Sequence, residues 1–334
     1  MGLTIGVVGA TGAVGRKMLE LLVEREIAVD SLRCFASERT AGQSLEWKGH
    51  EIIVELLTPE VMQESFDYLL FSAGGGVSET YAAIARDAGN TVIDNSSQWR
   101  MAEEVPLVVP EVNGHVLKGY QGIIANPNCS TIQMVMALAP LHRRYGIKRI
   151  VVATYQAVSG SGHKAIVELE NQLKDPESLP SVYPKRIAGN CLPHIDVFNE
   201  NGFTKEELKM VYETQKILED DTIEVNATTV RVPVFHSHSE SVTVTFHQQP
   251  DLAEVRELLI QAPGIVVQDD PANLEYPTPL SAAGRDETFV GRIRQDLFDP
   301  FTLSLWVVAD NLRKGAATNA VQILEKLEEQ KKPA

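Results

Sequence analysis

The sequence predicts an α/β protein in which a doubly wound parallel sheet comes first and an α+β domain with a mixed sheet follows. At the start, the apolar strand Leu3–Val8, a glycine-rich turn and the amphipathic stretch Arg16–Glu26 form a βαβ pattern. After about residue 130, strand-like segments are no longer separated by regular helices. A length of 334 residues also favours two domains over one core.

The first domain is predicted to continue the opening pattern in a Rossmann-like sheet over about 125 residues. Its further elements are strands at Ser31–Ser37, Tyr68–Ser72 and Thr91–Asp94 and a helix at Ser78–Ala88. The segment Trp47–Val54 is interrupted by Gly49, so we expect a hairpin at the edge of this sheet.

The second domain is predicted to begin with a helix from Cys129 to about Arg144 and the buried strand Arg149–Tyr155. Later strands are expected at Ala227–Val234, Ser241–His247, Thr288–Arg294 and Thr302–Ala309. The last helix, Lys314–Gln330, has an apolar face that needs a surface to cover, and we expect it to return to the first domain. The predicted domains are residues 1–129 plus 311–334, and residues 130–310.

Composition narrows the possible classes of protein. A net charge of −15 argues against nucleic acid as a partner, because a phosphate backbone requires a basic face. The three cysteines, Cys34, Cys129 and Cys191, are too few and too scattered for a disulfide framework or a zinc site. No signal peptide or membrane span is expected, so we predict a cytoplasmic protein. Because no zinc-site spacing is present, we also expect no metal.

Cys129 is the most informative single residue. It follows Asn126-Pro-Asn and directly precedes a helical stretch, where unpaired N–H groups and the helix dipole favour a thiolate. We expect the N–H groups of Ser130 and Thr131 to stabilise negative charge there. The alternative is a small buried apolar residue, the usual role of a free cysteine.

Gly9, Gly12 and Gly15 lie between a predicted strand and a predicted helix, where a dinucleotide-binding motif belongs. Gly9 permits the tight turn, Gly12 lets the backbone approach a pyrophosphate, and Gly15 allows close packing of helix on strand. The spacing is G-x-x-G-x-x-G, and a tight turn without a nucleotide is the alternative.

The end of the second predicted strand indicates which dinucleotide binds. An NAD site needs an acidic residue there for the ribose 2′-hydroxyl. Ser37, Arg39 and Thr40 would suit a 2′-phosphate, so NADP is favoured over NAD. Glu38 in the same turn keeps NAD open as an alternative.

Two further segments could carry chemistry. Gln156 and the glycine-rich loop after it follow a buried strand, and the loop is either a flexible corner or a ligand contact. His236 and His238 are spaced by two, which would place both on one face of a strand. Either histidine could serve a cysteine nucleophile as a base, and Arg231 could bind a carboxylate. The residues alone leave the choice of histidine open.

Several motifs together resemble the aspartate-β-semialdehyde dehydrogenase family along the whole chain. They are Gly9–Gly15, Ser97–Met101, Val109–Asn113, Asn126–Thr131, Tyr155–Gly160 and Arg231–Ser239. The resemblance implies NADPH-dependent reductive dephosphorylation of 4-phospho-L-aspartate to L-aspartate 4-semialdehyde, with release of phosphate, towards lysine, threonine and methionine. It also implies a second domain for catalysis and dimerisation, and a homodimer.

The resemblance assigns a role to each matching residue. Cys129 corresponds to the nucleophile that forms an acyl-thioester, Gln156 to the residue that orients the substrate, and His238 to the acid/base, because it lies seven residues after Arg231. Substrate ligands would be Arg231 for the carboxylate, Glu206 for the amine, and Arg100, Asn128 and Lys209 for the phosphate. Cofactor contacts would be Gly9, Thr11, Gly12, Ala13, Val14, Ser37, Arg39, Thr40, Ser159, Gly160 and Asn311.

Two alternatives compete with this function. An N-acetyl-glutamyl-phosphate reductase would use the same cysteine and histidine, but Glu206 suits a free ammonium better than an amide. A nucleotide-binding relative without catalysis would be expected to lack the thiol or its base, and both are present. The resemblance does not place the segment Pro176–Asn190. We expect this segment to be a loop and a candidate part of a dimer surface.

Overall fold

The computed structural model describes residues 2–331, and its contacts divide the chain into two compact units. The first unit comprises Met1–Pro127 and Ala316–Ala334, and the second comprises Asn128–Gly315. Each unit has its own six-stranded sheet. The division lies within a few residues of the predicted boundaries, and the separate roles of the two domains stay a prediction.

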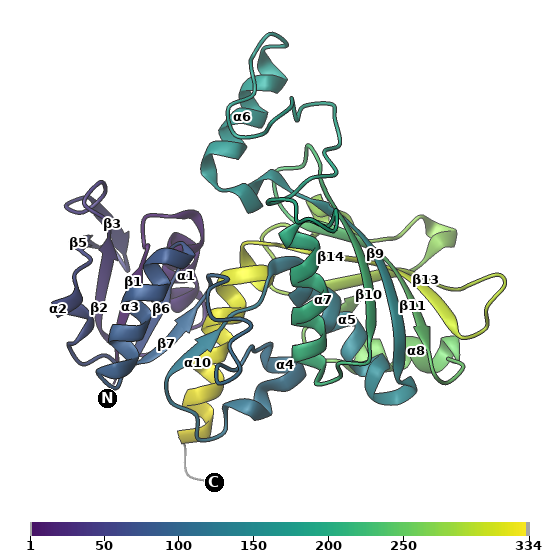
Figure 1. Cartoon of the computed structure of the whole chain (residues 1–334), viewed down its shortest axis with the longest axis horizontal. Helices are drawn as coiled ribbons and strands as arrows, with labels where there is room; N and C mark the ends of the chain where they lie inside the picture. Colours follow the sequence, from purple (N-terminus) through teal and green to yellow (C-terminus); the bar gives the residue numbers. More distant parts are fainter. Residues whose placement is uncertain (1, 332–334) are drawn as a thin grey trace. The chain divides into compact units, whose positions relative to one another are not determined.

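The sheet of the first unit is wholly parallel, with the order β5-β2-β1-β6-β7-β8 (Figure 1). Its strands are β1 (Leu3–Val8), β2 (Val29–Ala36), β5 (Glu55–Leu56), β6 (Tyr68–Phe71), β7 (Thr91–Asp94) and β8 (Ile123–Ala125). Strand order reverses between β1 and β6, so a crevice for a ligand is expected at their carboxyl ends. The predicted doubly wound sheet is confirmed, although β5 and β8 were too short to predict.

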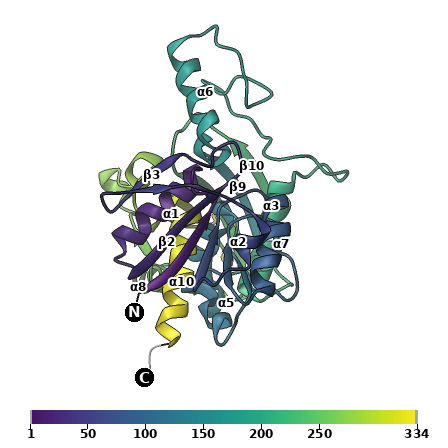
Figure 2. The ribbon, with the colours of Figure 1, turned by 90° about the vertical axis from the view of Figure 1, so that its left-hand side faces the viewer.

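Helices cover both faces of this sheet. Helices α1 (Ala13–Glu24) and α10 (Thr318–Lys331) lie on one face, and α2 (Pro59–Met62) and α3 (Gly75–Asp87) lie on the other (Figure 2). The short helix α4 (Pro110–Asn113) packs on α10. The predicted apolar face of the last helix is buried in the core of this unit, with Ala320, Val321 and Leu324 at most 1% exposed. A π-helical turn, Arg313–Ala317, precedes α10, so the helix begins later than predicted.

The predicted edge hairpin exists, but its first strand begins three residues before Trp47, at Ser44. Strand β3 (Ser44–Trp47) pairs with β4 (His50–Ile53), and Lys48 and Gly49 between them have φ of +51° and +76°. Positive φ at both central residues is the geometry of a two-residue hairpin turn. The predicted range therefore held the last residue of the first strand, the turn and the second strand.

The second unit contains a mixed sheet with the order β10-β9-β11-β14-β13-β12, which confirms the predicted sheet type. Its strands are β9 (Ile147–Gln156), β10 (Glu224–Arg231), β11 (His238–Phe246), β12 (Ile265–Val267), β13 (Thr288–Gln295) and β14 (Thr302–Ala309). Helices α5 (Cys129–Tyr145), α7 (Lys205–Leu218) and α8 (Leu252–Gln261) cover one face, and the short helix α9 (Pro279–Ala282) packs on β14.

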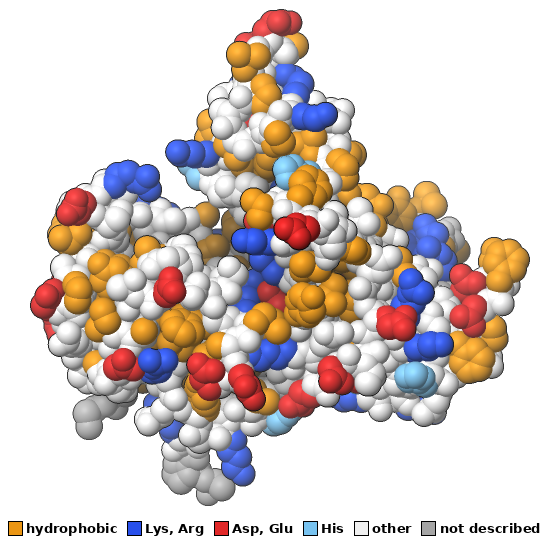
Figure 3. All heavy atoms as spheres, viewed as in Figure 1, with side chains coloured by type: hydrophobic (Ala, Val, Ile, Leu, Met, Phe, Trp, Pro, Cys, Tyr) orange, Lys and Arg blue, Asp and Glu red, His pale blue; other side chains and the backbone are white. Residues whose placement is uncertain are grey.

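A segment that includes α6 (His163–Lys174) projects from the second unit (Figure 1). Its loop, which contains Pro176–Asn190, is held to α6 by Glu168, whose carboxylate accepts hydrogen bonds from the N–H and hydroxyl of Ser181. Apolar side chains are exposed along the segment (Figure 3), including Leu173 at 59% and Leu179 at 82%. None of the helices within residues 2–331 is long and apolar enough to cross a membrane.

Candidate active site

Three strands of the second unit bring predicted site residues to one edge of the sheet. Strands β9 and β10 run parallel and end side by side, with Gln156 opposite Arg231. Strand β11 runs the other way and begins there with His238. All three side chains are buried. They share the strand face on which α5 and α7 pack, and those helices carry Cys129, Glu206 and Lys209.

Cys129 is the first residue of α5, as predicted, and is partly exposed. Asn128 is the N-cap residue of this helix. Its Oδ1 accepts hydrogen bonds from the N–H groups of Ser130 at 3.0 Å and Thr131 at 3.2 Å. Such a cap stabilises the first turn by about 1 kcal/mol, so Asn128 orders the backbone that carries the thiol.

The expectation that the N–H groups of Ser130 and Thr131 face a developing negative charge is wrong in this structure. Both N–H groups are already donated to the Asn128 side chain. The helix-start position was read correctly from the sequence, but the residue before Cys129 uses the same donors. Asn is a strong N-cap residue, which is the signal that could have revealed this competition.

Glu206 is the centre of a buried hydrogen-bond network. Its Oε1 accepts from Asn128 Nδ2 at 2.9 Å and Gln156 Nε2 at 3.2 Å, and its Oε2 accepts from Lys209 Nζ at 3.1 Å. Burial alone would raise the pKa of Glu206, but the Lys209 charge and these hydrogen bonds outweigh it and lower the pKa. Glu206 is therefore an anion at neutral pH, and it joins three predicted substrate ligands.

Lys209 is held by two carboxylates. Besides Glu206, its Nζ donates to Asp196 Oδ2 at 2.9 Å. Burial would lower the pKa of Lys209, but the negative charges of Glu206 and Asp196 outweigh it and raise the pKa. Lys209 thus stays cationic, as a phosphate ligand requires. Asp196 lies in a loop and had no sequence signal.

Helix α7 presents Glu206 and Lys209 from a well-anchored first turn. Thr204 and Glu207 form a reciprocal capping box, and Glu207 Oε1 also accepts from the N–H of Thr229 on β10. Glu206 and Lys209 are three residues apart and so lie on one face of the helix.

His238 is fully buried, and its ring is fixed by the backbone. Its Nδ1 accepts a hydrogen bond from the N–H of Ala157 at 3.0 Å, so the neutral ring carries its proton on Nε2. Nε2 has no hydrogen-bond partner among the described residues. Burial, aided by the charge of Arg231, lowers the pKa of His238 well below its usual value. The ring is therefore neutral at pH 7.

The two histidines do not share a strand face, contrary to the expectation from their spacing. Ser237 between them has a φ of +71°, and β11 begins only at His238. His236 is consequently exposed while His238 is buried. The N–H of Ser237 donates to Asn311 Oδ1 at 3.0 Å, which holds this turn. Alternation along a strand does not apply across a left-handed residue.

The buried neutral state of His238 predicts a pH-dependent stability. As the pH falls through about 6.5, the unfolded chain protonates His238 but the folded protein does not, because its folded pKa is lower. The neutral His238 therefore contributes fully to the free energy of unfolding above pH 6.5. Below that pH the free energy of unfolding falls by up to about 1.4 kcal/mol per pH unit. Urea unfolding at pH 7 and 5 should show a larger loss for the native protein than for His238→Asn. Equal losses would contradict the neutral assignment.

Arg231 meets the requirements of a carboxylate ligand. It is 4% exposed, its Nη1 donates to the carbonyl oxygen of Ala157 at 2.7 Å, and its buried Nε has no hydrogen-bond partner in the part of the chain that the structure describes. A buried, unused guanidinium donor beside the site favours an anionic ligand.

Gly160 lies close to both Arg231 and His238. A Cβ there would lie 2.9 Å from Arg231 Nη1 and 3.3 Å from His238 Nε2. The neighbouring Ser159 Oγ donates to Asn311 Oδ1 at 3.1 Å. The structure thus joins the three predicted cofactor contacts of this unit, Ser159, Gly160 and Asn311, to the turn that precedes His238.

Gly315 is a site residue that the sequence did not reveal. A Cβ at this position would lie 2.9 Å from the Cβ of Cys129. The π-helical turn that contains Gly315 therefore approaches Cys129 closely, and π-helical turns are frequent at functional sites. No local pattern around Gly315 predicts a contact with a residue so distant in the sequence.

In the first unit, six predicted cofactor residues line one cavity of about 550 Å³ at the carboxyl ends of β1 and β2. They are Gly9, Thr11, Gly12, Ser37, Arg39 and Thr40. Gly9 has a φ of +78°, and a Cβ there would lie 2.7 Å from the carbonyl oxygen of Ser72. The left-handed backbone and the close Ser72 carbonyl leave no room for a side chain, as the tight turn at Gly9 requires. Ala13 and Val14 form the first turn of α1, which follows it.

Part of this cavity was not predicted. Ser72, Ala73, Gly74, Val77 and Tyr81 also line it. Ser72, Ala73 and Gly74 form the turn between β6 and α3, where three consecutive glycines start at Gly74, and Val77 and Tyr81 lie on α3 itself. A second glycine-rich turn between strand and helix was the available signal.

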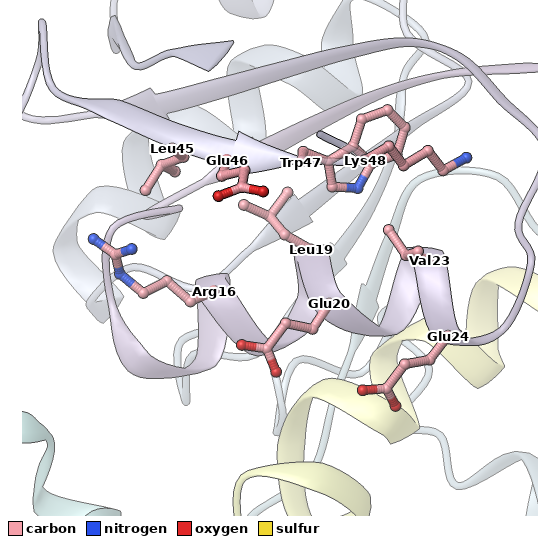
Figure 4. Close-up of a pocket in the computed structure, with 9 residues that line it drawn as sticks. All are labelled: Arg16, Leu19, Glu20, Val23, Glu24, Leu45, Glu46, Trp47 and Lys48. Carbon is pink, nitrogen blue, oxygen red and sulfur yellow. The ribbon is translucent and has the colours of Figure 1, made fainter. Parts of the chain in front are cut away.

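A separate cavity of about 470 Å³ lies between α1 and the β3–β4 hairpin (Figure 4). None of the predicted site residues lines it. Its three carboxylates, Glu20, Glu24 and Glu46, outnumber its two cations, Arg16 and Lys48. An acidic lining is poorly suited to a dinucleotide phosphate, so the cavity beside Gly9 is the better cofactor site.

Arg100 is a member of the first unit, and the backbone holds it. Its Nε donates to the carbonyl oxygen of Ser96 at 3.0 Å, and Nη2 donates to that of Asn95 at 3.0 Å. The residue is 8% exposed. Within residues 2–331, no group of three or more histidine, cysteine or acidic residues is arranged to hold a metal ion.

Comparison with known proteins gives a consistent result over the whole chain. Residues 4–120 match the family model described as semialdehyde dehydrogenase, NAD binding domain, and residues 138–314 match semialdehyde dehydrogenase, dimerisation domain. An aspartate-semialdehyde dehydrogenase of Aquifex aeolicus is 55% identical over 98% of both chains.

Two solved structures are similar in fold as well as in sequence. Aspartate semialdehyde dehydrogenase II of Vibrio cholerae, complexed with ASA, has a TM-score of 0.96 and 45% identity over 99% of this chain and 100% of that one. Aspartate semialdehyde dehydrogenase of Candida albicans with NADP has a TM-score of 0.76 and 25% identity over 98% of this chain and 99% of that one.

Proposed function

Because the chain belongs to the aspartate-semialdehyde dehydrogenase family, we propose that it reduces 4-phospho-L-aspartate to L-aspartate 4-semialdehyde, with release of phosphate. This reaction leads towards lysine, threonine and methionine, and we place it in the cytoplasm. The observation that carries the proposal is the cluster at one sheet edge. A helix-start thiol, a buried neutral histidine, an anchored carboxylate and two cations converge there from α5, α7, β10 and β11.

Cys129 is the nucleophile in this proposal. Its thiolate sulfur attacks the acyl carbon, the bond from that carbon to the phosphate oxygen breaks, and phosphate leaves, so that a thioester remains on Cys129. The first turn of α5, capped by Asn128, favours the thiolate through the helix dipole. When bound, the reduced nicotinamide supplies a hydride to the thioester carbon. Collapse of the resulting thiohemiacetal breaks the bond from carbon to sulfur and restores the thiolate.

His238 is the proton donor at the carbonyl oxygen. Its Nε2 carries the proton and is free of other protein groups in the described structure, while Nδ1 is bound by the Ala157 N–H. A hydrogen bond from Nε2 stabilises the negative charge that develops on the oxygen. To act as the initial base, His238 would have to carry its proton on Nδ1 instead of Nε2. It would then lose the hydrogen bond that Nδ1 accepts from the Ala157 N–H. The geometry therefore supports the donor role better than the base role.

The remaining residues bind and orient the substrate. Arg231 would bind the α-carboxylate through its unused Nε, and the Glu206 anion would receive the α-ammonium. Gln156, which bonds to Glu206, would align the acyl group, and Asn128, Lys209 and Arg100 would bind phosphate. An N-acetylated substrate lacks the ammonium that the Glu206 carboxylate would bind, which argues against the N-acetyl-glutamyl-phosphate alternative.

An assay of the reverse reaction tests this proposal. Purified protein is mixed with L-aspartate semialdehyde, phosphate and NADP, and the absorbance of the reduced cofactor is followed. We expect a signal that requires phosphate and that N-acetyl-glutamate semialdehyde does not replace. Cofactor reduction without phosphate, or with the acetylated substrate alone, would refute the assignment, and no reduction at all would favour a binding protein without catalysis.

NADP is the proposed cofactor within the NAD(P)-binding domain. Ser37, Arg39 and Thr40 line the cavity beside Gly9, and a guanidinium there would form charge-assisted bonds to a 2′-phosphate. The similar Candida albicans enzyme binds NADP, which supports this choice. Glu38 lines the same cavity, and its negative charge would repel a 2′-phosphate. The preference for NADP over NAD therefore depends on the balance between Arg39 and Glu38.

Replacing Arg39 by Leu should weaken NADP binding more than NAD binding. Loss of a hydrogen bond between charged groups costs about 1.5–3 kcal/mol, so the Kd for NADP should rise at least about tenfold while that for NAD stays within about twofold. Titration of cofactor fluorescence measures both. Glu38→Gln is the matched control, and it should strengthen NADP binding. Equal weakening of both cofactors by the Arg39 change would rule out a 2′-phosphate contact.

We also propose that two copies of the chain associate through the open face of the mixed sheet. Tyr155 and Val151 are 38% and 42% exposed on this face, and the rings of Tyr155 and Trp306 lie 5.5 Å apart. Beside them is a cavity of about 330 Å³, lined in part by Arg292 and Arg294. Clustered aromatic and arginine side chains are typical of interfaces, and a dimerisation-domain model matches this part of the chain.

Tyr155→Asp should shift the chain from dimer towards monomer, because it places a charge in the proposed interface. Sedimentation velocity over a range of concentrations would detect at least about a tenfold rise in the dimer Kd. Ile260→Asp is the control, since Ile260 is exposed at 65% on α8, on the side that the helices cover. An unchanged dimer in the Tyr155 variant would exclude this face.

A further inference from the structure

Glu240 is a buried carboxyl group to which the proposed reaction assigns no role. It is fully buried on β11, two residues after His238, so both side chains leave the strand on the face that packs against α5. No described cation forms an ion pair with it, and burial raises the pKa of Glu240 well above its usual value. Glu240 is thus an uncharged carboxylic acid directly behind His238.

Gln133 is the polar neighbour of Glu240 on α5. It lies four residues after Cys129, so it is one helical turn below the thiol on the same side of the helix. Its Nε2 donates to the carbonyl oxygen of His238 at 3.3 Å, which joins α5 to the start of β11. Its amide is close enough to Glu240 to lower the pKa of that carboxyl, in opposition to burial.

The unpaired polar atoms of Gln133 and Glu240 indicate that Glu240 carries a proton. Gln133 Oε1 and both carboxyl oxygens of Glu240 are buried and have no hydrogen bond of good geometry to any described group. A protonated Glu240 can donate its O–H to Gln133 Oε1, while Nε2 keeps its bond to His238. An ionised Glu240 would be a buried negative charge with no cation to pair with it.

We propose that Glu240, as a neutral acid, and Gln133 form a positioning pair that holds the start of β11, with His238, against the helix that begins with Cys129. The pair makes a second layer beneath the two reacting side chains: Gln133 under Cys129, and Glu240 under His238. Its neutrality also matters, because a carboxylate in this layer would disfavour the Cys129 thiolate. The catalytic consequence rests on the proposed function, whereas the protonation state does not.

The protonation state can be measured on the native protein without substrate. Infrared difference spectra between the native protein and Glu240→Gln at pH 7 should show a protonated carboxylic C=O stretch that the variant lacks. Absence of such a band from the native spectrum would overturn the proposal, and this part of the test does not require the variant to fold.

Alkylation of Cys129 by iodoacetamide gives a second readout without turnover. In a Cys191→Ser background, the alkylation rate as a function of pH reports the apparent pKa of the Cys129 thiol. Glu240→Gln replaces a neutral acid by a neutral amide, so the profile should stay within about twofold in rate at every pH. A faster reaction at low pH in the variant would mean that a negative charge had been removed, which would overturn the neutral assignment.

Leucine substitutions separate positioning from packing. Glu240→Leu should lower kcat in the L-aspartate semialdehyde assay about ten- to a hundred-fold with KM within about twofold, because His238 is displaced. The double variant Gln133→Leu/Glu240→Leu removes both polar partners and should regain thermal stability but not kcat, since the bond to the His238 carbonyl is gone. Native kcat in the double variant would show that the pair serves packing alone. Inactivity of the native protein would refute only the proposed function and would leave the spectroscopic and alkylation results intact.

Discussion

Cys129→Ser is expected to abolish the phosphate-dependent oxidation of L-aspartate semialdehyde, with a fall in kcat of at least about 10⁴-fold. Serine keeps nearly the same size at the start of α5, but its hydroxyl does not ionise near neutral pH, so neither the nucleophile nor the thioester forms. NADP binding should persist, because the residues of the cavity beside Gly9 belong to the first unit. Steady-state assays and cofactor fluorescence measure the two effects.

The matched control is Cys191→Ser. Cys191 is the exposed cysteine of the same unit and lies outside the cluster, so activity should stay within about twofold. Turnover by Cys129→Ser at a rate near that of the native protein would rule out the covalent route.

His238→Asn is expected to lower kcat by about 10² to 10⁴-fold, the usual contribution of a positioned acid or base. Asn can still accept the hydrogen bond from the Ala157 N–H through its oxygen, so the fold around β9 and β11 should be kept. It offers no ring nitrogen for proton transfer at the position of Nε2. Single-turnover hydride transfer, followed by absorbance, isolates this step from product release.

His236→Asn is the natural comparison, because it makes the same chemical change two residues away. His236 is exposed, and it lies before the left-handed residue Ser237, so its loss should change kcat by no more than about twofold. A larger loss at His236 than at His238 would reverse the proposed roles of the two histidines.

Much of the fold follows from local patterns. Strand β1 and strand β7 have the predicted bounds, and the parallel and mixed sheets are of the predicted types. Periodicity failed where elements were short, as in β5 with two residues, or where a turn interrupts the pattern. The boundaries of β10 and β11 moved because a strand ends at Arg231 and the next begins only after the turn at Ser237.

The site was less accessible to local reasoning than the fold. The thiol at a helix start and the glycine-rich turn are both visible in a few consecutive residues, since the backbone itself supplies their chemistry. The partners of these residues are not. Glu240 and Gln133 are more than a hundred residues apart, and nothing near either residue signals that their side chains meet.

The sequence by itself determined the sheet types, the helix-start position of Cys129 and the glycine-rich turn at Gly9, because these depend on neighbours within one element. Only the tertiary structure decided that His238 is buried and neutral while His236 is exposed, that Glu206 meets Asn128 and Gln156, and that Gly315 touches Cys129. The physical reason is that burial, pKa and hydrogen-bond pairing are set by groups distant in the chain, which packing alone brings together.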